Sequence, residues 1–179
     1  MNEDQETLTR RHLAGLVLNP AIFFLVLPLT LSLLLGVPAP SALVLIGAAF
    51  VIEYGAIAPA LAMGLDLLFS MAVISLVCLG VLLTSYEIFD LLSFRSEKIR
   101  AFLARVEGIR ITRGLRRYGI LALVPGMAVA GFYVCPAAAW IIGWRKGEAI
   151  VVMFAGFLAS AIIVALITLN LIPGVFGPV

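Results

Sequence analysis

The chain has 179 residues, of which 63% are hydrophobic and only 12% are charged, against roughly 25% charged in an ordinary soluble domain. Most of it consists of long uncharged runs, which cannot be solvated as a small globule. This composition excludes a soluble enzyme, a nucleic-acid-binding protein and a disulfide-rich scaffold. Both cysteines lie in apolar stretches and suggest no disulfide framework. We therefore predict an all-α, polytopic integral membrane protein.

The positions of the 12 basic residues predict how the chain is oriented in a bilayer, because Lys and Arg near membrane spans favour the cytoplasmic side. They are Arg10 and Arg11, eight residues from Arg95 to Arg117, and Arg145 with Lys146. The N-terminus is acidic and the first apolar run is too long for a cleaved signal peptide. We expect residues 1–12 to be a cytoplasmic tail in a prokaryotic plasma membrane protein.

Counting every apolar run as a span would place the basic groups on opposite sides of the membrane. Two re-entrant hairpins, one entering from outside and one from inside, would bring all of them to the cytoplasmic side. The resulting single membrane domain covers residues 13–179. Its predicted segments are a transmembrane helix at 13–35, a re-entrant hairpin at 41–66, a transmembrane helix at 67–86, an amphipathic interfacial helix at 95–111, a second hairpin at 112–144 and a transmembrane helix at 149–171.

Proline supports the two hairpins, since it lacks an amide donor and breaks a helix unless neighbours satisfy the freed carbonyl. Pro59 and Pro125 each lie in the middle of an apolar run. We expect the first hairpin to turn near Gly55–Pro59 and the second at Pro125-Gly126, with Ser41 and Thr112 as helix caps. Full spans kinked at proline are the alternative.

The two halves of the sequence also resemble each other. Residues 54–64 and 118–131 each begin with a Tyr-Gly pair, continue to a proline and end in a small-residue stretch closed by glycine. Because the predicted directions are opposite, this pattern is typical of the inverted repeats of secondary transporters. The second arms, beginning near Ala60 and Met127, would point helix N-termini at a shared site and favour an anion such as a phosphate.

Four stretches carry a resemblance to a known family. They are Glu53-Tyr54-Gly55-Ala56-Ile57-Ala58-Pro59, Tyr118-Gly119 leading to Val124-Pro125-Gly126, Ile142-Gly143-Trp144-Arg145-Lys146, and the final helix with Gly156. Together they resemble the small multidrug export protein family, which is similar in plan to the wider DedA/VTT (SNARE-associated) superfamily. The resemblance implies paired re-entrant hairpins and movement of lipids, such as polyprenyl phosphates or phospholipids, between leaflets. It also implies arginines beside the second Pro-Gly, where this chain has Ala122 and Ala128.

Glu53 is the first candidate for a substrate or proton site. A carboxylate at membrane depth costs about 2.5–3.5 kcal/mol on insertion scales, so it is rarely kept without a partner or a use. Its place beside the first predicted turn would put it where the hairpins meet, and a structural acceptor for freed amides is the alternative. The other predicted site residues are Gly55, Pro59, Asp66, Pro125 and Gly126, and Asp66 could instead be a helix cap.

The segment 95–117 has apolar residues three and four apart among its basic residues, which indicates an amphipathic helix on an anionic leaflet. Its predicted membrane-surface residues are Arg100, Arg105, Arg110, Arg113, Arg116 and Arg117. Plain topological anchoring is the alternative role. His12 is the only histidine, and no metal-site, cofactor or nucleophile pattern accompanies it. We expect no enzyme activity, no cofactor and no metal.

Taken together, the sequence predicts a transporter or flippase for an amphiphilic, phosphate-bearing lipid, coupled to protons. Its partners would be membrane lipids, the amphiphilic substrate and a second copy of the chain, with Gly156, Ala159 and Ser160 permitting close helix packing. One alternative is a proton-coupled exporter of small cationic amphiphiles with Glu53 as counter-charge. The other is a non-transporting membrane subunit or assembly factor.

Overall fold

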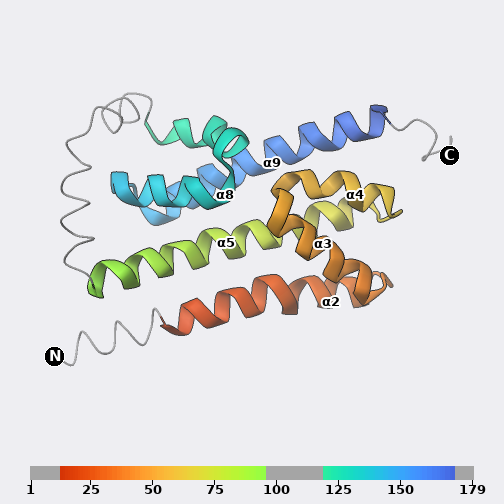
Figure 1. Ribbon diagram of the computed structural model, residues 1–179, viewed down its shortest axis with the longest axis horizontal. Helices are drawn as coiled ribbons and strands as arrows, with labels where there is room; N and C mark the ends of the chain where they lie inside the picture. Colours follow the sequence, from red (N-terminus) through yellow and green to blue (C-terminus); the bar gives the residue numbers. More distant parts are fainter. Residues whose placement is uncertain (1–12, 96–118, 172–179) are drawn as a thin grey trace.

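The computed structural model describes residues 13–95 and 119–171, and these are helical with short connections (Figure 1). The first helix begins at Leu13. The elements that follow are η1 (Ala21–Val26), α2 (Leu27–Leu34), α3 (Ala39–Ile52), η2 (Glu53–Ala56), α4 (Ile57–Ala62), α5 (Leu67–Arg95), η3 (Ile120–Ala122), α8 (Leu123–Ile142) and α9 (Lys146–Leu171). The expected tail at 1–12, the basic helix at 95–111 beyond Arg95, and the start of the second hairpin lie outside the described residues.

Five helical segments are long and apolar enough to cross a membrane, which is consistent with an integral membrane protein. Each has between 22 and 26 residues, against the roughly 20 that a bilayer core requires. They are Leu13–Leu34, Ala39–Ala62, Leu67–Leu92, Ile120–Ile142 and Lys146–Asn170. The all-helical class predicted from the sequence is therefore found in the described residues.

The first helix passes through Pro20 without breaking. Proline removes one amide donor, and the six residues after Pro20 adopt π-helical geometry before α2 resumes the regular helix. The helix then ends at a tight turn, where Gly36 has a φ of 67° and the Ser32 hydroxyl donates to the Val37 carbonyl at 2.7 Å. The observed end at Leu34 lies one residue before the predicted end of the span.

The first broken helix consists of α3, η2 and α4. It begins at Ala39 with Pro40 in its first turn, so Ser41 is not the cap that the sequence suggested. α3 ends at Ile52, and the interruption starts at Glu53, two residues before the predicted Gly55–Pro59 turn. Figure 1 shows that α3 and α4 start and finish at the same end of the molecule.

The second broken helix is α8, and its interruption lies at Gly131 instead of the predicted Pro125-Gly126 turn. A Cβ placed on Gly126 would lie 3.4 Å from Cys135 Sγ. Nine residues of unbroken helix would separate these positions by about 13 Å along the axis. The two arms of α8 therefore lie side by side, and Figure 1 shows that they start and finish at the end of the molecule opposite to the outer ends of α3 and α4.

Both prolines predicted to mark turns lie in first turns of helices. Pro59 is the third residue of α4, and Pro125 is the third residue of α8. The first amides of a helix have no acceptor within it, so a missing N–H costs nothing there. The prolines mark where helices begin, which explains why the interruption of α8 lies six residues beyond Pro125.

Two long helices frame these broken ones. α5 and α9 run the length of the molecule, as Figure 1 shows, and both are longer than the predicted spans at 67–86 and 149–171. Asp66 caps α5, accepting a hydrogen bond from the Phe69 amide at 3.0 Å. α5 continues nine residues past Tyr86, and the acids on this extension have partners on α8 and α9.

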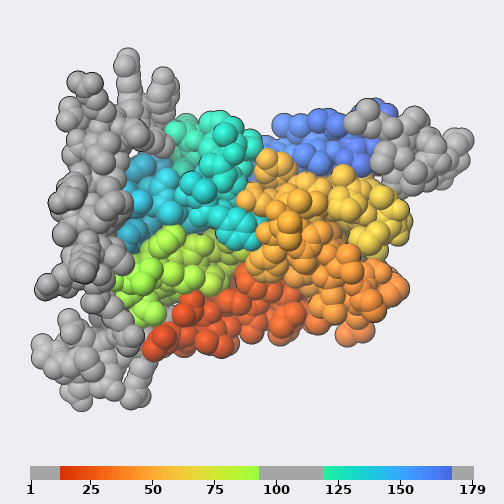
Figure 2. Space-filling model, viewed as in Figure 1, coloured from red at the N-terminus to blue at the C-terminus, as the bar shows by residue number. Residues whose placement is uncertain are grey.

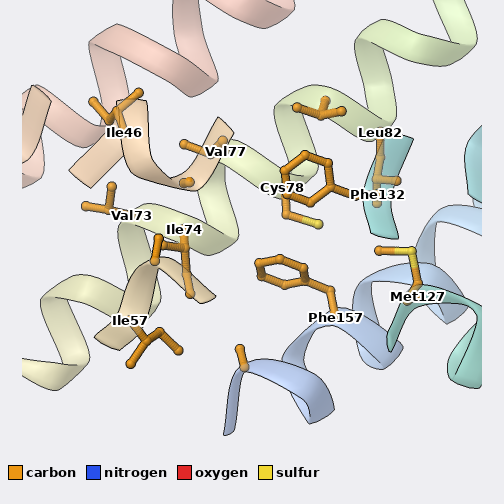
Figure 3. Packing of buried hydrophobic residues seen from close by; sticks show 14 of the residues in the cluster. Ile46, Ile57, Val73, Ile74, Val77, Cys78, Leu82, Met127, Phe132 and Phe157 are labelled. Carbon is orange, nitrogen blue, oxygen red and sulfur yellow. The ribbon is translucent and has the colours of Figure 1, made fainter. Parts of the chain in front are cut away.

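The core lies where α5, α8 and α9 meet the first broken helix. Figure 3 shows it from close by, with Phe132 and Phe157 among aliphatic residues of α5 and α8. Two glycines allow close packing: a Cβ on Gly80 would overlap the Phe24 ring, and one on Gly156 would lie 2.8 Å from the Val124 carbonyl oxygen. Of the three small residues predicted to permit dimer packing, Gly156 and Ser160 are buried within the protein and Ala159 is exposed.

The packing of Gly156 leads to a stability prediction. Gly156→Ala should lower the free energy of unfolding in detergent by about 1–3 kcal/mol, because the backbone of Val124 cannot move aside as a side chain could. Gly47→Ala, in α3 with nothing within 4 Å of the new Cβ, should raise it by about 0.5–1 kcal/mol. Thermal and denaturant unfolding measure both, and a stabilising Gly156→Ala would contradict the observed packing.

Candidate functional site

The two helix interruptions are in contact with each other. Glu53 has a φ of 53° and a ψ of −125°, and it is the only residue other than glycine with a positive φ in the described parts of the chain. Gly131 has a φ of 73°. A positive φ costs a side-chain-bearing residue on the order of 1–3 kcal/mol, which persists only where the surroundings impose it. Glu53 therefore holds a strained backbone at the place where the two broken helices meet.

Three hydrogen bonds join the two interruptions. The Phe132 amide donates to Glu53 Oε2 at 3.2 Å. The Tyr54 hydroxyl donates to the Ala128 carbonyl at 2.8 Å, and the Tyr133 hydroxyl donates to the Phe50 carbonyl at 2.7 Å. Each bond satisfies a backbone group at an interrupted helix, where the regular i to i−4 partners are lost. Each broken helix thus supplies hydrogen-bonding partners to the other.

The side chain of Glu53 explains why a glycine stands opposite it. A Cβ placed on Gly131 would overlap Glu53 Oε1, Oε2 and Cδ. The positive φ of Gly131 also disfavours any larger residue. Conformation and space therefore both require glycine at this position.

An open pocket of about 260 Å³ lies over this contact. Its lining residues come from the ends of both interrupted helices: Val51, Ile52, Glu53, Tyr54, Val129, Ala130 and Gly131. Val51 is 81% exposed and Val129 is 90% exposed, so apolar side chains flank the opening on the outer surface. Figure 2 shows the surfaces of α3 and α8 meeting on this face of the molecule. In a bilayer such an opening would face lipid.

Glu53 supplies the only charged side chain among the residues that line the pocket. No group of three or more His, Cys, Asp or Glu side chains that could hold a metal ion occurs within residues 13–95 and 119–171. The chemistry available at the pocket is that of one partly buried carboxylate beside carbonyls and phenols.

The structure separates the six predicted site residues. Glu53 lines the pocket, whereas Gly55 and Pro59 lie in η2 and α4 just beyond it. Pro125 and Gly126 lie in the first turn of α8. Asp66 is exposed at the start of α5, separated from η2 by the length of α4. Its observed contact is that of a helix cap.

None of the family models, curated proteins or solved structures compared with this chain matches it. Its function is therefore inferred from the geometry of its own residues.

A second polar group lies at the other end of α5. Lys146 donates to Glu87 at 2.7 Å, and the Trp140 indole donates to Asp90 at 2.9 Å. Glu87 is mostly buried, whereas the nearby Arg145–Glu148 pair is largely exposed. These contacts tie the end of α5 to the end of α8 and the start of α9. We assign this group a structural role, because its charges are already paired.

Sequence reasoning missed three contributors to the pocket contact, Phe50, Phe132 and Tyr133, and it singled out Ala128 only as a neighbour of the second Pro-Gly pair. In the sequence, all three aromatic residues are ordinary members of apolar runs. Gly131 was recognised only as the end of a small-residue stretch. A signal was available in Tyr54 and Tyr133, because a phenol inside an apolar segment needs a hydrogen-bond partner when it is buried.

The overlap between Gly131 and Glu53 predicts a coupling between the two positions. Gly131→Ala should lower the free energy of unfolding by roughly 2–4 kcal/mol through backbone strain and collision with the carboxylate. In a Glu53→Gly background only the strain remains, and the loss should fall to about 1–2 kcal/mol. A double-mutant cycle measured by unfolding in detergent tests this. Equal losses in the two backgrounds would contradict the contact.

Proposed function

We propose that this protein is a membrane transporter of amphiphilic molecules, with its substrate site at the Glu53 pocket. The observation that carries the proposal is the placing of one carboxylate at the junction of two interrupted apolar helices. Irregular backbone at membrane depth is tolerated only where it is buried in protein or lines a cavity. Interrupted helices around a shared ionisable group are a recurring feature of secondary transporters.

We further infer that the two broken helices are re-entrant hairpins related as inverted repeats. In support, each interruption has a positive φ, at Glu53 and Gly131. Each also has a carbonyl three residues earlier, of Phe50 or Ala128, that accepts a tyrosine hydroxyl from the other helix. Three segments would then cross the membrane, and membership of the small multidrug export family or the DedA/VTT superfamily stays part of this proposal.

The pocket favours a cationic head group on the substrate. Glu53 provides its charge, and the carbonyls at the interruptions add further negative dipoles. The helix N-terminus expected near Met127 to attract a phosphate lies at Phe132 instead, where the second arm of α8 starts, and the Phe132 amide already donates to Glu53. A substrate cation would displace a proton from the carboxylate, and this exchange would couple transport to a proton gradient.

A lipid bearing a phosphate is the second candidate substrate, and the Phe132 amide is the observation that favours it. If Glu53 is protonated or moves away, this N–H faces the pocket at a helix N-terminus and can donate to a phosphate oxygen. The two candidates therefore require opposite charge states of Glu53.

Glu53→Gln separates the two substrates, because it keeps the shape and hydrogen-bonding reach of the side chain and removes its charge. Transport of a cationic dye into proteoliposomes should fall roughly 10- to 100-fold, as expected for losing a hydrogen bond to a charged group, and its pH dependence should disappear. The matched control is Asp66→Asn, which removes a carboxylate that is exposed and caps α5. This control should transport the dye like the parent.

Movement of labelled phospholipid and polyprenyl phosphate is measured on the same preparations. Unchanged or faster lipid movement in Glu53→Gln, together with no dye transport by the parent, would favour the phosphate-bearing lipid. Normal dye transport by Glu53→Gln across pH 5–8 would show that the carboxylate is structural. If the parent moves none of the three compounds, a non-transporting membrane subunit becomes the better hypothesis.

The hairpin topology is tested by labelling single cysteines from each side of the membrane, after replacement of Cys78 and Cys135. Cysteines at positions 100 and 145 should label from the same side, and a cysteine at position 38 from the opposite side. The reason is that a re-entrant second hairpin returns the chain to the side from which it entered. Labelling of positions 100 and 145 from opposite sides would mean that α8 crosses the membrane.

A further inference from the structure

We propose that Tyr54 and Tyr133 form a reciprocal latch that holds the two interrupted helices together beneath the open Glu53 pocket, and that its release lets the junction separate and deepens the pocket from the membrane side. The two hydroxyls donate in opposite directions across the same junction, to Ala128 and to Phe50. This inference rests on the proposed function, because only a transported substrate would need the junction to separate. Opening itself can be measured without any transport.

The geometry of the junction shows where it can separate. On its inner side, the rings of Tyr54 and Phe132 pack against Phe157 of α9, with centroid distances of 6.3 and 5.9 Å. On its outer side lie the exposed residues Val51 and Val129, which have no such packing. The two interrupted helices would therefore separate first at the outer side, while the aromatic contacts with α9 stay in place.

The two tyrosines are suited to this role because of what they bond. The carbonyls of Phe50 and Ala128 belong to the last turns before the interruptions, where a helix leaves its acceptors without intrahelical donors. In apolar surroundings such an acceptor strongly favours the state in which a donor reaches it. Both bonds form only when the two ends are together, so they stabilise the closed state jointly.

The latch is tested by the rate at which a maleimide reacts with the native Cys78 in the full-length protein, in proteoliposomes and with Cys135 replaced by alanine. Cys78 is fully buried in the core, in the same cluster as Phe132 of the junction and Phe157 of α9 (Figure 3). Tyr54→Phe and Tyr133→Phe should each accelerate labelling about three- to tenfold, as expected for one lost hydrogen bond, and the double variant by about the product. Tyr86→Phe is the matched control, because the Tyr86 hydroxyl is buried in α5 without a hydrogen-bond partner. It should leave the rate unchanged.

Unchanged labelling in both single variants, or an equal acceleration by Tyr86→Phe, would overturn the latch. A second measurement covers variants that fold poorly. Val51→Cys and Val129→Cys, one on each side of the pocket, are bridged in the otherwise intact protein by a short bifunctional methanethiosulfonate. Bridging should slow labelling of Cys78 at least tenfold, and reduction should restore it. Labelling that is indifferent to the bridge would also overturn the latch, whereas a latch without any transport would count against the proposed function alone.

Discussion

The structure depends on one constraint, which is that backbone amides and carbonyls released at a helix interruption must find partners in apolar surroundings. A single unsatisfied group costs several kcal/mol where water is absent. In this protein the partners come from the other interruption, through Glu53, Tyr54 and Tyr133. The two broken helices consequently stabilise each other, and the position of the pocket follows from this pairing.

Glu53 combines three properties in one residue. Its backbone is strained, its side chain satisfies an amide of the other broken helix, and its carboxylate lines a pocket that opens between exposed apolar residues. A glycine would relieve the strain, and an apolar residue would be cheaper to bury. These two costs, together with the contact between distant segments, are why the proposed function assigns a role to the charge of Glu53.

Composition and periodicity were sufficient to predict the helical class and the approximate ends of most helices, because these depend on local apolar character. Glu53 could be singled out for the same reason, as a lone acid beside an interruption. The interruption at Gly131 could not be predicted, since it depends on the carboxylate of Glu53, whose contact with Phe132 joins residues 79 positions apart. The Pro-Gly pair at 125–126 gave a stronger local signal, yet a proline in a first turn is compatible with the helix. Likewise, α5 extends to Arg95 because its two acidic residues there have donors on other helices: Lys146 donates to Glu87 and Trp140 donates to Asp90.

The Asp66 cap at the start of α5 and the ion pair between α5 and α9 define a fixed length of apolar helix between two polar ends. Twenty residues separate Leu67 from Glu87, which corresponds to about 30 Å of helix and equals the usual thickness of a bilayer's hydrocarbon core. Asp66 at one end and the Glu87–Lys146 pair at the other would then both lie at the membrane surfaces. Hydrophobic matching along α5 would set the depth of the whole protein, because any vertical shift would draw one of these charged groups into the acyl chains. A change in bilayer thickness would therefore change the depth of the pocket in the membrane without any contact between the lipid and the pocket residues.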